Sequence, residues 1–456
     1  MTSAPLESSL PGLLASSCAE HDVPGAAVGV LHNGGEYFAC HGVTSVTDPL
    51  PVTPGTLFLI GSTSKTVTAT ALMALADQGK VRLDDRLTSH LPGLPVTGEA
   101  ARAAVTVGQL LDHTAGWTGD VETEGGWGDD ALAAALPDLL GKAGQITPPG
   151  ELMSYNNTSF VVAGHLLATL AGEPFETAAR RLVLDPLGLA STWYFPWEVA
   201  TRRVAVGHAP GPDGPQPVPQ WPLQRWIAPA GGVISTAADQ LRYARFQLDG
   251  SCPGTPPVST GTRMLMRRQR VAATGPLDGV GVSWLLRRYG GLDLVEHGGN
   301  VSNLHVSAFA LVPSHNLAVT TLTNAAGGGT VGREVLEHVL ERLTGQGQPL
   351  APPPRAMDPA LAAEYAGRYR AGEWDLDVSP DGDGLAVTLR LRADWGEVAD
   401  AVRSTFENEP ERLVLTGPDT VAAADRPAFP VGDFIRDADG AVRFFRYKLR
   451  LSAKER

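Results

Sequence analysis

Cysteine, excess positive charge and long apolar runs are all scarce in this sequence. Its 456 residues include only three cysteines, Cys18, Cys40 and Cys252, with no CxxC pair and no Cys/His cluster. This spacing excludes a disulfide framework and a zinc site, and it favours a reducing compartment. We therefore expect no metal and no other cofactor. The formal net charge of −13 leaves no basic stripe for phosphates, so nucleic acid is not an expected partner.

Signals for export or membrane insertion are also missing. The N-terminal stretch MTSAPLESSLPGLLASSCAEH has neither a basic n-region nor a continuous apolar segment of signal-peptide length. No apolar run approaches the roughly 20 residues of a membrane span. These features predict a cytoplasmic protein that does not contact a membrane, and they leave its oligomeric state open.

The composition is that of a globular protein, with 43% hydrophobic and 19% charged residues. The length exceeds that of one ordinary core and suggests two domains of unequal size. Residues 348–357 contain the run Ala351-Pro352-Pro353-Pro354, which is typical of a semi-rigid linker. We therefore predict one domain over residues 1–347 and a smaller one over residues 358–456.

Strand patterns occur at both ends of the larger domain, around a helical middle. Residues 26–31 and 37–41 have the pattern of two short strands across the turn His32-Asn33-Gly34-Gly35, and residues 304–312 and 317–324 show strand-like alternation. Segments so far apart in the chain would suit a single sheet. The prediction is an α/β (α+β) sandwich in which an antiparallel sheet packs with a helical subdomain.

The smaller domain consists of short strand patterns separated by Asp-Gly turns. The predicted strands are residues 365–369, 374–378, 385–391, 412–416, 434–437 and 442–451. They indicate a small antiparallel β-domain that resembles a barrel. The basic tail from Arg443 to Arg456 is expected to be a solvated edge strand protected by its charge. In the alternative, Arg446 or Lys448 reaches a site and holds a substrate carboxylate.

The strongest chemical signal is Gly61-Ser62-Thr63-Ser64-Lys65-Thr66, which opens a helix after an apolar run. Three residues separate Ser62 from Lys65, so their side chains lie on one face of the helix. A serine hydroxyl needs an adjacent base to become a nucleophile. A partly desolvated lysine near a helix N-terminus has a lowered pKa and suits that role. Taken alone, the motif could equally be a helix N-cap serine followed by a solvent-exposed lysine.

Two further segments carry polar groups. Tyr155-Asn156-Asn157 offers a proton-transfer group and an amide on a loop, although a turn with a packed tyrosine would look the same. His297-Gly298-Gly299-Asn300 precedes the strand at residues 304–312. Its paired glycines allow a substrate backbone to approach closely, and its histidine offers a hydrogen-bond donor. A β-turn is the alternative explanation for this pair of glycines.

These three segments resemble, in order and separation, the motifs of the β-lactamase and penicillin-binding-protein superfamily. The similarity is closest to its class C, D-aminopeptidase, esterase and peptide-cyclase branch. VTVGQLLDHTAG at residues 105–116 and AGGVISTAADQL at residues 230–241 are similar to further segments of that branch. The resemblance covers residues 8–345. The smaller domain resembles the lipocalin-like appendage of several peptidase and cyclase relatives.

The resemblance implies a role for each residue. Ser62 would be the acylated nucleophile, Lys65 its proton acceptor and Tyr155 the general acid/base. Asn157 would orient Lys65 and the substrate amide, and the N–H groups of Ser62 and Asn300 would form the oxyanion hole. The resemblance leaves His113 as a structural loop residue and makes Trp117 a wall of the acyl pocket.

One departure bears on the substrate. Most β-lactamases carry Lys-Thr-Gly where this chain has His297-Gly298-Gly299. The missing lysine removes a fixed positive charge that suits a β-lactam carboxylate. We therefore expect a serine acyl-transfer enzyme acting on a small-molecule or peptide ester, amide or peptide carbonyl, with water or an amine resolving the acyl-enzyme. A true β-lactamase or D-aminopeptidase is one alternative, and a non-catalytic penicillin-binding-type sensor is another.

Overall fold

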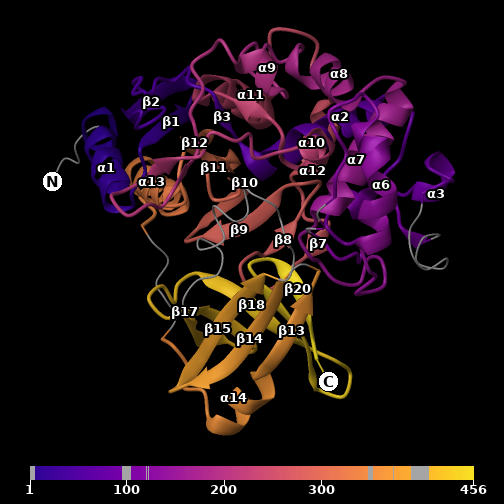
Figure 1. The fold of residues 1–456 in the computed structure, drawn as a ribbon, viewed down its shortest axis with the longest axis vertical. Coiled ribbons are helices and arrows are strands. Elements are labelled where there is room, and N and C mark those ends of the chain that lie inside the picture. The colour runs from indigo at the N-terminus through magenta and orange to yellow at the C-terminus, as the bar shows by residue number, and fades with distance from the viewer. Residues whose placement is uncertain are drawn as a thin grey trace.

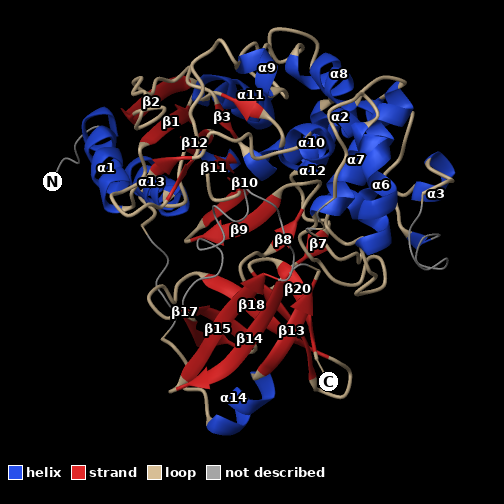
Figure 2. Ribbon diagram, in the orientation of Figure 1, coloured by secondary structure: helices blue, strands red, loops and turns tan. Residues whose placement is uncertain are grey.

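The computed structural model describes residues 6–94, 104–119, 121, 123–347, 353–372, 374–391 and 410–455. A larger α/β body contains the N-terminal three quarters of the chain, and a β-barrel lies below it in Figure 1. Figure 2 shows that helices are concentrated in the larger body, whereas the barrel is almost entirely strand. The predicted fold class, with its lipocalin-like C-terminal barrel, is confirmed.

The larger body is built on an eight-stranded sheet with the order β2-β1-β12-β11-β10-β9-β8-β7. Its strands are β1 (Gly25–His32), β2 (Gly35–Gly42), β7 (Val271–Ala272), β8 (Gly279–Val280), β9 (Leu285–Tyr289), β10 (Leu292–Val301), β11 (His305–Val312) and β12 (Leu317–Thr323). β1 pairs antiparallel with β12, so the sheet joins strands from both ends of the larger body. This pairing agrees with the expectation from the strand patterns.

Helices cover both faces of this sheet. Along β1, alternate side chains enter two different apolar clusters, because successive side chains of a strand point to opposite faces. Val28 packs with α1 (Leu6–Glu20) and α13 (Gly328–Thr344) on one face. Ala27 packs on the other face with α11 (Ala237–Asp249) and the helical subdomain.

The helical subdomain surrounds α2 (Ser64–Asp77), which is buried over most of its length. The other helices are α3 (Leu87–His90), α5 (Val107–Leu111), α6 (Ala131–Lys142), α7 (Asn157–Ala171), α8 (Phe175–Ala179), α9 (Pro196–Val199), α10 (Ala228–Gly231) and α12 (Thr260–Met266). Two short strand pairs complete the body: β3 (Phe58–Leu59) with β6 (Ile234–Ser235), and β4 (His208–Ala209) with β5 (Gln216–Pro217). The β3–β6 pair places the end of β3 beside the residues that follow α10, because the Ile60 N–H donates to the Val233 carbonyl.

The C-terminal barrel is closed. It contains β13 (Gly367–Ala371), β14 (Trp374–Asp381), β15 (Gly384–Leu391), β16 (Glu411–Gly417), β17 (Thr420–Ala423), β18 (Pro430–Arg436), β19 (Val442–Tyr447) and β20 (Arg450–Lys454). Aromatic side chains fill its interior, where the Phe434 ring stacks 4.1 Å from Tyr365 and 4.3 Å from Phe445. A barrel packed in this way resembles a protein core more than a ligand carrier.

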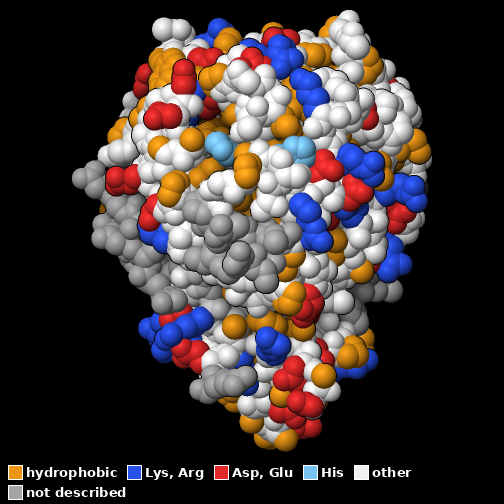
Figure 3. Space-filling model, turned by 90° about the vertical axis from the view of Figure 1, so that its right-hand side faces the viewer, with side chains coloured by type: hydrophobic (Ala, Val, Ile, Leu, Met, Phe, Trp, Pro, Cys, Tyr) orange, Lys and Arg blue, Asp and Glu red, His pale blue; other side chains and the backbone are white. Residues whose placement is uncertain are grey.

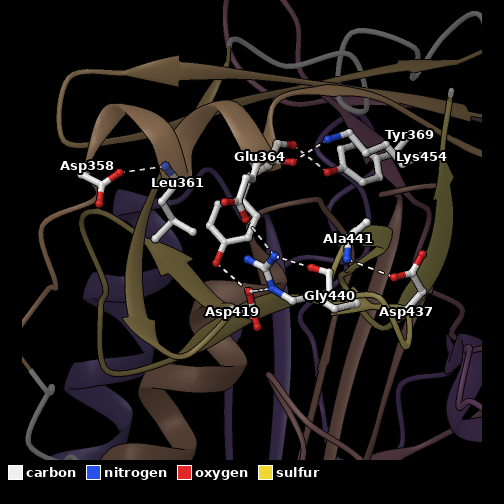
Figure 4. A network of polar contacts seen from close by, with 11 residues as sticks. Asp358, Leu361, Glu364, Tyr369, Asp419, Asp437, Gly440, Ala441 and Lys454 are labelled. Carbon is white, nitrogen blue, oxygen red and sulfur yellow. Dashed lines mark hydrogen bonds and ion pairs between the residues drawn. The ribbon is translucent and has the colours of Figure 1, made fainter.

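Helix α14 (Pro359–Tyr365) covers the end of the barrel that faces away from the larger body (Figure 1). Polar contacts fasten it there. Arg436 donates to Asp419 at 2.9 Å and to Glu364 at 2.8 Å, and the Tyr365 hydroxyl donates to Asp419 at 2.7 Å (Figure 4). This network lies at the opposite end of the barrel from the larger body.

The tail of the chain differs from its prediction. Residues 442–451 form two strands, because Lys448 and Leu449 both adopt positive φ and make a tight turn between them. β20 pairs with both β19 and β13, so the basic tail closes the barrel and is not an edge strand. Of the predicted linker 348–357, residues 348–352 lie outside the described residues.

The surface carries both signs of charge. On the face shown in Figure 3, Lys and Arg side chains are interspersed with Asp and Glu side chains. No helix in the described part of the chain combines the length and apolar character that a membrane span requires.

Candidate active site

Ser62 lies in a single turn of 3-10 helix, Gly61–Thr63, which connects β3 to α2. The residue before it must be glycine, since Gly61 has a φ of +51°. A Cβ atom at Gly61 would lie only 2.9 Å from the backbone nitrogen of Asn300. The turn therefore places Ser62 at the start of a helix and close to β10.

Lys65 is buried one turn further on, and its ammonium nitrogen has three acceptors within 3.0 Å. Nζ lies 3.0 Å from Ser62 Oγ, 2.6 Å from Asn157 Oδ1 and 2.7 Å from the Ala230 carbonyl oxygen. An amide oxygen and a carbonyl oxygen only accept, so each accepts a hydrogen bond from Lys65. The remaining position on Nζ points at the serine hydroxyl. In the neutral amine, this position holds a lone pair that can receive the serine proton.

The two acceptors behind Lys65 come from separate helices. Asn157 is the first residue of α7, and the Asn156 side chain caps that helix by accepting from the Ser159 N–H at 2.7 Å. Ala230 belongs to α10. The segment containing Tyr155, Asn156 and Asn157 is therefore a helix start, where the sequence suggested a loop. The cap fixes the direction in which Asn157 points.

Tyr155 lies beside Lys65. Lys65 Nζ is 4.9 Å from the centre of the Tyr155 ring, and the tyrosine is 5% exposed. The His113 ring stacks on Tyr155, with ring centres 4.5 Å apart. His113 Nδ1 accepts the Asn156 N–H at 3.1 Å, so the proton of this imidazole is on Nε2.

Burial, with Lys65 nearby, holds the pKa of His113 well below its usual value and keeps the ring neutral. The sequence assigned His113 a structural role, and in the structure His113 supports the Tyr155 ring.

The Trp117 side chain does not line an open pocket, because it is buried in the hydrophobic core. It therefore does not form the wall of the acyl pocket that the resemblance implied.

His297, Gly298, Gly299 and Asn300 are part of β10 and do not form a β-turn. They pair with residues 306–309 of β11, while the pairing with β9 ends at Glu296. A Cβ atom at Gly299 would lie 1.9 Å from the Ile60 carbonyl oxygen, so a larger residue there would displace the turn that carries Ser62. Glycine is needed at this position for close approach of protein to protein.

His297 is buried and neutral. Its Nδ1 lies 2.7 Å from the Gly298 carbonyl oxygen, which only accepts, so Nδ1 carries the proton. Burial and the positive charge of Lys65 lower its pKa to about 3. Nε2 is buried and has no hydrogen-bond partner among the described residues. The His297 ring is centred 6.0 Å from that of Tyr155, so its free acceptor belongs to the same site.

The barrel contributes a cation that the sequence did not single out. The Arg450 guanidinium lies 4.8 Å from the Tyr155 ring centre and 5.3 Å from that of Trp374. These three residues line a narrow cleft between the two bodies, together with Thr118, Gly119, Ser154, Ala371, Gly372 and Leu451. A turn predicted at Lys448-Leu449 would have placed Arg450 at the start of a separate strand. The sequence carries no such signal, because neither lysine nor leucine is a usual turn residue.

The two basic residues considered from the sequence are engaged elsewhere. Arg446 is buried in an ion pair with Asp433, at 2.8 Å. Lys448 is largely exposed and pairs with Glu411 at 3.1 Å. Within the described ranges, no group of three or more His, Cys, Asp and Glu side chains could hold a metal ion. The structure thus brings together Ser62, Lys65, Tyr155 and Asn157, next to the His297–Asn300 segment of β10.

Comparisons with known proteins identify the family. A family model described as Beta-lactamase matches residues 10–344, and the chain belongs to this family. "Penicillin-binding protein 4" from Amycolatopsis lactamdurans is 36% identical over 366 residues, which cover 77% of this chain and 94% of that protein.

Two solved structures extend the comparison. The crystal structure of SurE superposes with a TM-score of 0.77 at 26% identity and covers 98% of this chain and 99% of SurE, barrel included. SurE has also been solved with D-Leu. A class C β-lactamase from Rhodobacter sphaeroides superposes with a TM-score of 0.59 at 26% identity, covering 72% of this chain and 98% of that enzyme. The predicted superfamily is confirmed.

Proposed function

We propose that this protein is a serine acyl-transfer enzyme that forms an acyl-enzyme on Ser62. The observation that carries the proposal is the position of Lys65 Nζ, held by Asn157 and Ala230 so that its third direction faces the serine hydroxyl. A helix cap would not require a buried lysine with three acceptors. A serine next to a desolvated base is the arrangement that nucleophilic catalysis uses.

In the first step, Ser62 Oγ attacks the substrate carbonyl carbon and its proton passes to Lys65 Nζ. The negative charge that develops on the carbonyl oxygen is stabilised by the N–H groups of Ser62 and Asn300. The close approach of Gly61 to the Asn300 nitrogen supports this pair of donors. The leaving group takes a proton from Tyr155, which recovers one from Lys65. Water or an amine then reverses these steps and releases the acyl group.

We infer that the substrate is an amino-acid or peptide derivative with an anionic group. Arg450 supports this inference, since a guanidinium beside the catalytic cleft suits a carboxylate. SurE, which is similar to this chain over both bodies, has been solved with D-Leu, and that ligand supports an amino-acid derivative as the substrate. His297 argues against a main role on β-lactams, because it is neutral where most β-lactamases have a lysine.

A single experiment separates the candidate functions. The protein is incubated with activated esters of D- and L-amino acids, simple acyl esters and a cephalosporin, with and without added amines, and its intact mass and products are measured. An adduct on Ser62 that turns over identifies an enzyme, and amide products identify a transacylase or cyclase. An adduct without turnover identifies a sensor. If Ser62→Ala retained wild-type turnover, the assignment of the nucleophile would be wrong. The cytoplasmic location remains a prediction.

A further inference from the structure

The segment Met153-Ser154-Tyr155 is held by the barrel through one hydrogen bond at each residue. Arg446 Nη1 donates to the Met153 carbonyl at 3.1 Å, and the Leu451 N–H donates to Ser154 Oγ at 3.1 Å. The Tyr155 N–H donates to the Leu449 carbonyl at 2.8 Å. The next residue, Asn156, is held instead by the larger body, through His113 and Trp117. The Ser154 N–H also donates to the larger body, to the His113 carbonyl at 2.9 Å. Tyr155 thus lies where contacts from the barrel meet contacts from the larger body.

Among the barrel residues that hold this segment, Arg446 has a network of further polar partners. Arg446 and Asp433 are 3% and 4% exposed, and they face each other across β19 and β18 with contacts of 2.9 and 2.8 Å. Thr274, from the larger body, donates to Asp433 at 2.6 Å and accepts from Arg446. The pair therefore lies at the junction and bonds to two separate segments of the larger body.

Such a pair is a costly way to obtain stability alone. Two charges removed from water often stabilise a protein no more than apolar residues of the same size would. What this pair supplies is direction, because a guanidinium with fixed partners aims its remaining N–H groups at defined points. One of these points is a carbonyl two residues before Tyr155.

We propose that Arg446, oriented by Asp433, is a positioning residue that holds the Tyr155 hydroxyl where it can protonate the leaving group. This proposal rests on the proposed function. It assigns the barrel a part in catalysis that does not involve ligand binding in the barrel interior. A small displacement of a catalytic group is enough to affect rate, since misplacement by about 1 Å can cost about 10²-fold.

The test compares two esters of one acyl group, the methyl and p-nitrophenyl esters of N-acetyl-D-leucine. p-Nitrophenolate leaves without a proton, whereas methoxide needs one. In the acylation step, which kcat/KM reports, only the methyl ester therefore depends on Tyr155 as a proton donor. Arg446→Met should lower kcat/KM for the methyl ester by about 10²-fold and leave the p-nitrophenyl ester within about threefold. Arg446→Lys should restore part of the loss, because a lysine retains a donor for Met153.

Arg436→Met is the matched control. Arg436 also pairs with charged partners in the barrel, but these are Asp419 and Glu364, in the network that fastens α14. It should leave the ratio of the two esters unchanged. In a Tyr155→Phe background, Arg446→Met should no longer alter that ratio, because the group that Arg446 positions is gone.

Equal loss on both esters, or an undiminished effect of Arg446→Met in the Tyr155→Phe background, would overturn the proposal. If Arg446→Met does not fold, Asp433→Asn with Arg446→Met removes both charges together and must shift the ratio in the same direction. Ser154→Ala deletes a single contact with Leu451 and must give a smaller shift of the same sign. If the wild type forms no Ser62 adduct with either ester, the proposed function fails, which is a different result from an unchanged ratio.

Discussion

Replacing Lys65 by methionine removes the amine that faces the Ser62 hydroxyl and keeps a side chain of similar length. The general-base role predicts a fall in kcat/KM of about 10²–10⁴-fold, since this is the usual contribution of a positioned proton acceptor. At 1.36 kcal/mol for each factor of ten, the transition state loses about 3–5 kcal/mol.

The same substitution has a smaller expected effect on stability. Asn157 Oδ1 and the Ala230 carbonyl each lose a donor, and such a loss costs about 1–3 kcal/mol for a buried group. The variant also no longer buries an amine, which acts in the opposite direction. We expect the free energy of unfolding to fall by no more than about 3 kcal/mol.

Thr68→Val provides a matched control. Thr68 lies on the same helix and donates to the carbonyl of Pro229, next to Ala230, at 2.7 Å. Its loss should destabilise the fold by about 1–3 kcal/mol and leave activity nearly intact. Turnover of an activated ester and urea unfolding are measured for both variants. A Lys65→Met enzyme with turnover within about threefold of wild type would refute the role of Lys65 as base.

Three further predictions concern selectivity and pH. His297→Lys should raise the ratio of cephalosporin to activated-ester turnover about 10-fold or more, since a charge-assisted hydrogen bond is worth about 1.5–3 kcal/mol; efficient cephalosporin turnover by the wild type would contradict this reasoning. Arg450→Gln should raise KM for carboxylate-bearing substrates about 10-fold or more and spare neutral esters, with Lys448→Gln as the silent control in the same turn; equal KM changes in both variants would count against it. Burial lowers the pKa of His305 and of His297 to about 3, and that of His113 in the same direction. Below pH 6.5 the unfolded chain therefore binds protons that the folded chain does not, so the melting temperature should fall as pH decreases from 6.5 towards 3. His305→Asn should flatten this dependence, and an unchanged slope would show that His305 does not contribute.

The fold class was predictable because its signals are local. Short apolar strand patterns occur at residues 26–31 and 317–324, and the sheet joins these two strands as expected. The short strands of the smaller domain were predictable from the Asp-Gly turns between them, but closure of the barrel and its last turn were not. Lys448-Leu449 adopts positive φ without a glycine, since its neighbours in the barrel and the larger body hold it there.

The sequence also identified the candidate site, and the reason is again local. Ser62 and Lys65 share one helical face whatever surrounds them, because a separation of three residues decides this. The motif does not predict that Lys65 is buried, nor does it identify the two acceptors that orient the Lys65 amine. These come from Asn157 and Ala230, which lie 92 and 165 residues further along the chain.

What the sequence by itself determined was the family, the nucleophile motif and a histidine at position 297 where most β-lactamases have a lysine, since each depends on residue types at short spacing. Only the tertiary structure decided which barrel residue lies at the site. Arg446, Lys448 and Arg450 lie close together in the sequence, yet one is buried against Asp433, one is exposed and one lies over Tyr155. Their directions depend on barrel closure and on contacts with residues nearly 300 positions away, at Met153 and Tyr155. No short-range pattern encodes contacts at that distance.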